Sequence, residues 1–295
     1  MYLICMKGYY NTDLTSPRTI RNIQEQFGFT FKKGLGQNFL TARNILEEIV
    51  DAAEIESGVI EVGPGFGVLT SELAQNSDKV VTIEIDERLI DVLDYTLEEY
   101  DNVKIINEDI LKLDLKKVID DEFKGEKVSI AANLPYYITT PIITKLLEEK
   151  LPIKNIVVMV QKEVAERMSA KPSTKDYGAI TVLCQYYTEP SIVANVPASL
   201  FVPPPKVDSA VLKLKVLDKP SVEVKDEGVF FRVVKAAFSQ RRKTLLNCLS
   251  ANFAIPKDEI STLLESIGIA PSRRGETLSL EEFANIADTL LQKIK

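Results

Sequence analysis

Short apolar runs alternate with amphipathic helical patterns over residues 44–161, and this alternation restricts the fold more than any other feature. The runs are rich in β-branched residues and lack a regular polar alternation, which is typical of strands buried on both faces. Strands separated by helices favour a parallel, doubly wound α/β sheet with right-handed crossovers. We expect strands at 58–63, 79–86, 103–109, 127–133 and 155–161, and helices at 44–53, 68–76, 88–100 and 142–149.

The pattern changes after residue 168. A loop rich in Lys, Pro, Ser and Asp precedes a predicted helix at 177–187 and two predicted strands at 189–197 and 206–216. Residues 218–228 combine charge, Pro and Gly with few apolar positions, as linkers do. Four helical patterns follow and predict a small all-α C-terminal domain. The expected division is an N-terminal segment 1–41, an α/β domain 42–217 and a helical domain 218–295.

The composition excludes several classes of protein. Apolar residues make up 45% and charged residues 27% of the 295 positions, as in globular proteins, and no apolar run reaches the length of a membrane span. The start, MYLICMKGYY, lacks the features of a signal peptide. Three unpaired cysteines indicate neither a disulfide framework nor a zinc site. Histidine is absent, which excludes Ser-His-Asp and Cys-His catalysis.

Charge is distributed unevenly along the chain. The net charge is −7, but residues 84–126 alone carry −9. Two stretches are basic: residues 18–43 contain five cations and one acid, and residues 232–243 contain five cations and no acid. A solvated face is the usual explanation of each run. Two such runs on an acidic chain favour a bipolar surface, one side of which can meet phosphates.

The sequence EVGPGFG (61–67) lies between the first predicted strand and its helix. Its glycines permit a tight turn and the close approach of a ligand to main-chain N–H groups. A dinucleotide fingerprint would need a third glycine at Val68, so this spacing departs from it. Glu84 ends the second strand, where a carboxylate can accept two hydrogen bonds from a ribose, and Asp109 ends the third. The three strand ends together predict a nucleoside site.

NLPYYITTP (133–141) follows the fourth predicted strand, at the same edge of the sheet. Proline ends the strand pairing, so an amide and aromatic rings are placed at a sharp turn. A simple turn that caps the strand is one interpretation of this segment. A binding site beside the nucleoside is the other.

The whole pattern resembles the small-subunit ribosomal RNA adenine N6,N6-dimethyltransferases of the KsgA/RsmA type, which use S-adenosylmethionine. The resemblance covers nearly the whole chain, with the motifs in the family's order. It implies a Rossmann-like methyltransferase sheet. MYLICMKGYY has no counterpart in the family and is expected to be an extra leader. The matching motifs are LGQNFL (35–40), EVGPGFG, NLPYYITTP, VQKEVAERM, KPSTKDYGAITV, FVPPPKVDSAVLKL and AFSQRRKTLLN (237–247).

The resemblance implies roles for individual residues. Those assigned to the cofactor are Asn38, Leu40, Gly63, Gly65, Glu84, Asp109 and Asn133. Asn133 and the Leu134 backbone would hold the target amine, and Tyr136 would stack on the target base. Phe201 is expected to give a second stacking face, although a core aromatic at a strand end explains it nearly as well. The expected RNA contacts are Lys32, Lys33, Arg241, Arg242 and Lys243.

The predicted activity is therefore the transfer of methyl groups from S-adenosylmethionine to two adjacent adenosines near the 3′ end of small-subunit rRNA. The expected partner is this rRNA or the pre-30S particle, and the expected enzyme is cytoplasmic and monomeric, without metal or membrane. One alternative is a large-subunit rRNA adenine methyltransferase of the macrolide-resistance type. The other is a non-catalytic ribosome assembly factor that keeps the fold.

Overall fold

A seven-stranded sheet forms the centre of the chain in the computed structural model, which describes residues 13–28 and 38–294. Along the chain, the first five strands of this sheet run parallel, and its last two join at one side as an antiparallel pair. The strands in order across the sheet are β4 (Val103–Asn107), β3 (Val80–Glu84), β2 (Val59–Val62), β5 (Val128–Asn133), β6 (Ile153–Gln161), β9 (Ser209–Val216) and β7 (Thr188–Val196).

Helices cover both faces of this sheet, which confirms the predicted doubly wound architecture. One hydrophobic cluster joins a face of the sheet to α1 (Pro17–Gln26), α2 (Arg43–Ala53), α3 (Val68–Gln75) and α4 (Ile90–Thr96). A second cluster joins the other face to α5 (Leu115–Phe123), α6 (Thr139–Glu148), α7 (Lys162–Met168) and α8 (Ala179–Tyr187). Successive residues of β6 alternate between the two clusters, because side chains in a strand point to opposite faces.

Several elements differ from the expectation from sequence, and α1 is one that was not predicted. The segment predicted as one helix over 88–100 is a 3-10 turn, η2 (Glu87–Leu89), followed by α4, which ends at Thr96. Helix α5 was not predicted, although Asp114 caps it by accepting a hydrogen bond from Lys117 N at 3.0 Å. Two short strands, β1 (Phe39–Leu40) and β8 (Phe201–Val202), pair with each other outside the main sheet. Strands of two residues carry no periodic signal.

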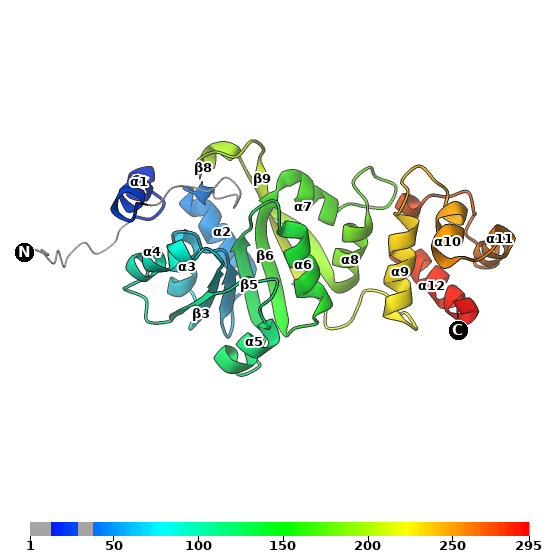
Figure 1. Ribbon diagram of the computed structural model, residues 1–295, viewed down its shortest axis with the longest axis horizontal. Helices are drawn as coiled ribbons and strands as arrows, with labels where there is room; N and C mark the ends of the chain where they lie inside the picture. Colours follow the sequence, from blue (N-terminus) through cyan, green and yellow to red (C-terminus); the bar gives the residue numbers. More distant parts are fainter. Residues whose placement is uncertain (1–12, 29–37, 295) are drawn as a thin grey trace, which may run out of the picture.

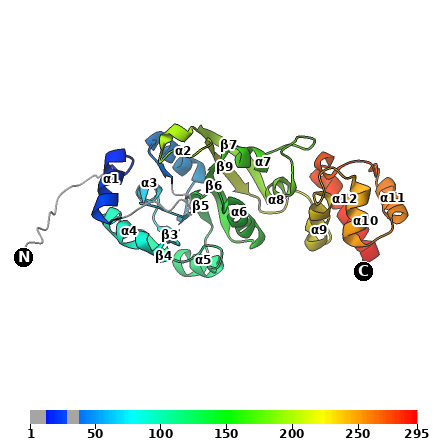
Figure 2. The same cartoon turned by 45° about the horizontal axis from the view of Figure 1, so that its top comes forward.

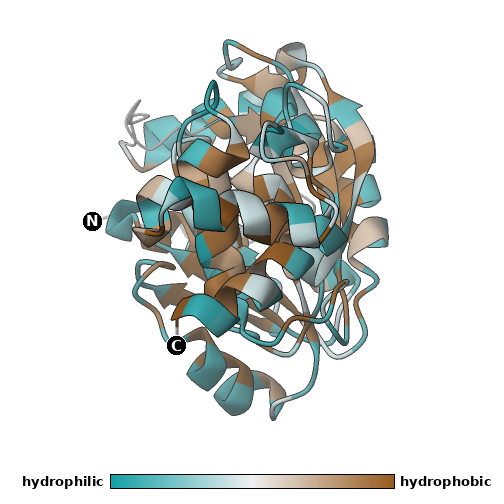
Figure 3. Cartoon of the chain, turned by 90° about the vertical axis from the view of Figure 1, so that its right-hand side faces the viewer, coloured by the Kyte–Doolittle hydropathy of each residue, from teal (hydrophilic) through white to brown (hydrophobic). Residues whose placement is uncertain are grey.

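Four helices follow β9 and a connection over residues 217–226. They are α9 (Glu227–Ala237), α10 (Leu245–Phe253), α11 (Lys257–Ser266) and α12 (Leu280–Ile294). They lie at the end of the elongated molecule opposite α1 (Figures 1 and 2). Viewed from that end, the ribbons carry hydrophilic and hydrophobic residues side by side, as amphipathic helices do (Figure 3). The domain division at residue 217 stays a prediction, since the second cluster continues through α8 into these helices.

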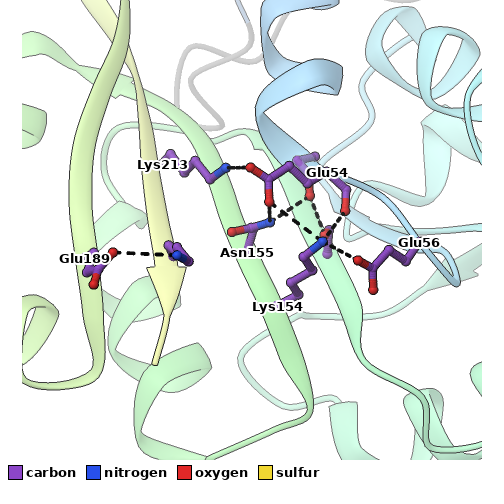
Figure 4. A network of polar contacts seen from close by, with 9 residues as sticks. Glu54, Glu56, Lys154, Asn155, Glu189 and Lys213 are labelled. Carbon is purple, nitrogen blue, oxygen red and sulfur yellow. Dashed lines mark hydrogen bonds and ion pairs between the residues drawn. The ribbon is translucent and has the colours of Figure 1, made fainter. Parts of the chain in front are cut away.

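Ion pairs join the layers at the edge where the parallel strands begin. Glu54, which ends α2 in a left-handed conformation, accepts a hydrogen bond from Lys213 Nζ of β9 at 2.6 Å. Lys154 of β6 donates to Glu56 Oε1 at 2.6 Å, and the buried Asn155 donates to Ala53 O at 3.1 Å (Figure 4). This network fixes the end of α2 against the sheet. The longest described helix, α12, has 15 residues, and none of the described helices is long and apolar enough to cross a membrane.

Candidate active site

A cleft opens at the carboxyl edge of β2, β3, β4 and β5, opposite the ion-pair network. It encloses about 1150 Å³ of empty space, the open solvent at its mouth included. Small-molecule sites of proteins commonly occupy this edge of an open α/β sheet. Nine of the residues that the sequence singled out line it: Asn38, Leu40, Gly63, Gly65, Glu84, Asp109, Asn133, Leu134 and Tyr136.

The glycine turn after β2 gives the cleft its floor. Gly63 and Gly65 have φ angles of +73° and +60°, which L side chains rarely adopt. A Cβ at Gly65 would lie 2.8 Å from the Phe39 ring, so only glycine lets β1 cross the turn this closely. A Cβ at Gly63 would meet nothing within 4 Å and would fill open space instead. The Gly63 N–H donates to Ile83 O at 2.9 Å, so its carbonyl is the polar group left for a ligand.

Glu84 ends β3 beside this turn with only 6% of its surface exposed. Burial raises the pKa of its carboxyl above the ordinary value, and hydrogen bonds from the backbone amides of Asp86 and Gly65 oppose that rise. Its Oε1 accepts from Asp86 N at 2.8 Å. No described lysine or arginine forms an ion pair with Glu84. A buried carboxylate held by backbone amides keeps acceptor capacity for a ligand with hydroxyl groups.

Asp109 lies two residues after β4, and its Oδ1 accepts a hydrogen bond from Leu111 N at 3.0 Å. Sequence reasoning missed the apolar residues that follow the two acids. Ile85 and Ile110 both line the cleft, and Ile85 is 54% exposed. Their signal in the sequence was an aliphatic residue directly after each acid. Together they can contact the two faces of a flat ring whose edge reaches an acid.

Glu61, inside β2, is an acid that sequence reasoning missed. It is 1% exposed and lines the cleft from beneath the glycine turn. Burial raises its pKa to about 8, although Thr70 Oγ1 donates to its Oε2 at 2.5 Å. Burial therefore favours the protonated form of this carboxyl in the folded protein. The only sign in the sequence was an acid within an otherwise apolar strand.

Asn133 ends β5 in the wall of the cleft. Its Nδ2 donates to Asn38 O at 3.1 Å, which turns the amide oxygen away from Asn38 and leaves it to accept. Leu134 N donates to Met159 O of β6 at 3.1 Å, and the next turn closes through Ile138 N to Pro135 O at 3.1 Å. The turn therefore does not use the Leu134 carbonyl. Two acceptors, the Asn133 oxygen and the Leu134 carbonyl, stand together at this strand end.

Tyr136 and Phe201 differ in where the fold places their rings. Tyr136 lines the cleft, and its hydroxyl lies 2.7 Å from Ser209 Oγ, which fixes the ring. Phe201 is 2% exposed, pairs with Leu40 across β1 and β8, and does not line the cleft. This position favours the packing interpretation of Phe201 over a second stacking face.

The predicted RNA contacts divide into three groups. Lys32 and Lys33 lie outside the described residues. Arg241 Nη2 donates to Lys175 O at 2.7 Å and Arg241 Nε lies 3.7 Å from Glu276, yet the side chain stays 69% exposed. Arg242 and Lys243 are exposed, and neither forms an ion pair with any residue that the structure describes. Arg241 thus also holds the 171–178 loop against the C-terminal helices.

Comparisons with known proteins agree on one family. Residues 28–292 match the family described as "Ribosomal RNA adenine dimethylase". The chain is 54% identical over 285 residues to "Ribosomal RNA small subunit methyltransferase A" of Bacillus mycoides (strain KBAB4), which covers 95% of this chain and 98% of the relative. The relative of the same name from Bacillus cereus (strain B4264) gives the same figures.

Two solved structures extend this likeness to the fold. A dimethyladenosine transferase from Plasmodium falciparum superimposes with a TM-score of 0.70 at 30% identity, covering 84% of this chain and 95% of that one. The 23S rRNA methyltransferase ErmE superimposes with a TM-score of 0.65 at 28% identity, covering 86% and 100%. The sheet and the C-terminal helices are therefore shared features.

Proposed function

Since this chain belongs to the ribosomal RNA adenine dimethylase family, we propose that it dimethylates N6 of two adjacent adenosines near the 3′ end of small-subunit rRNA. It is an S-adenosylmethionine-dependent rRNA methyltransferase, as its family is. The observation that carries the choice of substrate is the 54% identity over 95% of the chain to small-subunit methyltransferase A relatives. The reaction takes place in the cytoplasm during small-subunit assembly, with the enzyme acting as a monomer.

The residues of the cleft fit the cofactor. The open space beside the Gly63 carbonyl admits its methionine end, and Glu84 accepts from its ribose hydroxyls. Asp109 accepts from the adenine amino group, while Ile85 and Ile110 contact the ring faces. Leu40 in β1 and Asn38, directly before β1, cover the site beside Gly65. S-Adenosylmethionine supplies an activated methyl group on a sulfonium when bound.

The target amine is held by the two acceptors at the end of β5. An exocyclic adenine nitrogen shares its lone pair with the ring and is a poor nucleophile. The Asn133 oxygen and the Leu134 carbonyl accept hydrogen bonds from its N–H groups. These bonds favour a pyramidal nitrogen and stabilise the positive charge that develops on it. Because Asn38 holds the Asn133 amide through Nδ2, these acceptors are oriented before the substrate arrives. No base with a tuned pKa is required, which suits a chain without histidine.

The target base stacks on Tyr136 after it leaves the RNA stack. Ser209 anchors the Tyr136 hydroxyl, so little rotational freedom is lost when a base binds. Base–aromatic stacking contributes about 1–3 kcal/mol, enough to offset much of the cost of unstacking. Phosphate contacts come from Arg241, Arg242 and Lys243, with Lys32 and Lys33 as further candidates. They act locally, because a net charge of −7 does not attract RNA as a whole.

One experiment separates this proposal from its alternatives. Labelled S-adenosylmethionine is incubated with the enzyme and under-methylated small-subunit particles, or with large-subunit particles, and the label is mapped. We expect label at N6 of two neighbouring adenosines near the 3′ end of the small-subunit rRNA. Label only in large-subunit rRNA would support the macrolide-resistance alternative. Particle binding without label in either rRNA would support a non-catalytic assembly factor.

A further inference from the structure

Three segments meet at the side of the cleft that holds Tyr136. The Tyr136 hydroxyl lies 2.7 Å from Ser209 Oγ, so the turn after β5 contacts the start of β9. Gln161 at the end of β6 pairs with Ser209, and Lys162 N donates to Asp208 O at 3.0 Å. The turn after β5, the start of α7 and the loop before β9 therefore form one rim of the cleft, which we call the target rim.

The target rim exposes large apolar side chains. Tyr137 lines the cleft mouth and is 58% exposed, the most of any large hydrophobic residue in the described parts of the chain. Val207 is 45% exposed on the neighbouring loop. The adjacent Tyr136 is half-buried with its hydroxyl anchored, so the two tyrosines differ in what holds them. An exposed aromatic ring beside a substrate cleft is a surface on which a flat ligand can stack.

The target rim also carries two lysines that are not in ion pairs with any described residue. Lys162 and Lys206 are exposed, and within the described residues neither forms an ion pair. The acid between these segments, Asp208, uses Oδ1 to accept from Ala198 N at 2.9 Å. Glu163, which follows Lys162, pairs with Arg167 at 2.6 Å. Two lysines without an ion pair, on segments that meet the turn carrying an exposed aromatic ring, match the chemistry of single-stranded nucleic acid, which offers bases and phosphates together.

We propose that the target rim binds the nucleotides flanking the target adenosine, with Tyr137 stacked on a neighbouring base and Lys162 and Lys206 on phosphates. This rests on the proposed function, because it needs RNA to enter the cleft from this side. The nucleotides next to a flipped base remain covalently joined to it, so they lie near the opening of the cleft. There the Tyr137 ring can stack on one of their bases. The second of two adjacent target adenosines is then kept beside the site while the first is methylated.

The test compares Tyr137→Ala with Tyr137→Phe in the full chain, using under-methylated small-subunit particles. Tyr95→Ala is the matched control, since Tyr95 is 49% exposed on α4. We expect Tyr137→Ala to weaken particle binding about 5- to 150-fold. Tyr137→Phe and the control should bind like the wild type. Calorimetry should show unchanged S-adenosylmethionine affinity in all three variants.

The lysines give an independent test that does not depend on Tyr137. The double variant Lys162→Glu and Lys206→Glu should lower the slope of log K against log salt by about 1.4–1.8, at about 0.7–0.9 for each phosphate partner. If the wild type methylates the particles but Tyr137→Ala and the lysine variant bind and react normally, the target rim proposal is wrong. Wild-type enzyme that never labels small-subunit rRNA would instead overturn the proposed function. The same variants are also tested on naked rRNA and on rRNA with assembly proteins added. If the variants bind naked rRNA normally and lose affinity only when the proteins are present, the target rim contacts a protein, and the proposal is wrong.

Discussion

Glu54 and Glu122 at the amino edge of the sheet differ from Glu61 and Glu84 at the carboxyl edge in burial, in ion pairing and in the direction of their pKa shifts. At the amino edge, acids are paired with lysines: Glu54 with Lys213 and Glu122 with both Lys79 and Lys104. These hydrogen bonds hold the pKa of Glu54 and of Glu122 below its usual range. The network of Glu54 is drawn in Figure 4.

At the carboxyl edge Glu61 and Glu84 are buried, and no described lysine or arginine forms an ion pair with either of them. Two other acids at this edge do have a cationic partner: Asp86 pairs with Arg88, and Asp109 lies 3.7 Å from Lys112. Burial raises the pKa of Glu61 and of Glu84. A charged group taken from water without a counter-ion costs stability. The amino edge therefore stabilises the fold, whereas the carboxyl edge holds polar groups ready for a ligand at the expense of stability. The contrast between Glu54 and Glu122 on one side and Glu61 and Glu84 on the other is the basis of the predictions that follow.

The largest effect is expected at the target-amine acceptor of the cleft. Asn133→Ala should lower the methyl-transfer rate roughly 10- to 1000-fold, the range for removing one preorganised hydrogen-bonding group. Single-turnover assays with enzyme in excess over particles measure this rate directly, and circular dichroism checks the fold. S-Adenosylmethionine affinity can fall slightly, since Asn133 borders that site. Near-normal turnover, or an unfolded variant, would remove Asn133 from the reaction.

Glu84→Ala should lower cofactor affinity by about 1.5–3 kcal/mol, the contribution of charge-assisted hydrogen bonds to a ribose. In the wild type the affinity should fall as pH falls, because a protonated Glu84 accepts less well. Since burial raises the pKa of Glu84, this fall begins at a higher pH than for an ordinary glutamate. Calorimetry across pH tests both statements. Tighter binding of NAD than of S-adenosylmethionine would contradict the site assignment.

Glu61→Gln tests whether a buried carboxyl without an ion pair at the cleft edge lowers the free energy of unfolding. A carboxyl with its pKa raised to about 8 favours its protonated form in the folded protein. The contribution of Glu61 to the free energy of unfolding is fully present below the pKa of the unfolded chain, near 4.5. As pH rises from there toward 8, this stability is lost at about 1.4 kcal/mol per pH unit. The variant lacks this loss, so it should gain stability relative to the wild type as pH rises. Urea denaturation at several pH values measures the difference.

Reversing Arg241 and Arg242 to Glu tests the basic surface of the C-terminal helices. The double variant should weaken particle binding and lower its salt slope by about 0.7–0.9 for each phosphate that no longer has a cationic partner, with cofactor affinity unchanged. Lys257→Glu, on exposed α11, is the control for a charge change elsewhere in these helices. Equal binding by the double variant and the control would mean that the pair only contacts solvent and the 171–178 loop.

Glu122→Gln is the counterpart of Glu61→Gln at the other edge, and its effect should be smallest. Removing the ion pairs with Lys79 and Lys104 should cost about 0.2–1 kcal/mol, since both lysines are well exposed. Because the pKa of Glu122 is lowered, this contribution is present above the unfolded pKa and disappears as pH falls through the folded value. The sign is therefore opposite to that of Glu61→Gln. Two variants that respond to pH in the same direction would contradict the contrast between the edges.

The succession of strands and helices along the chain, and the positions of Gly63, Glu84, Asp109 and Asn133 at or near strand ends, were predictable from the sequence. Parallel strands present their carboxyl ends at one edge, so residues that end successive strands meet even when they are far apart in the chain. Local periodicity is enough to find such strands, because burial on both faces leaves continuous apolar runs. The residues of the NLPYY turn followed from the same reasoning.

Other features were decided only by interactions between distant segments. The Asn133 amide is oriented by Asn38, 95 residues away, and Phe201 is buried because β8 pairs with β1. Glu61 and Glu54 are the same residue type, and only burial or a lysine from another element gives their pKa values opposite shifts. Sequence determines which groups end a strand, but orientation, burial and ion pairing depend on what the rest of the chain brings beside them.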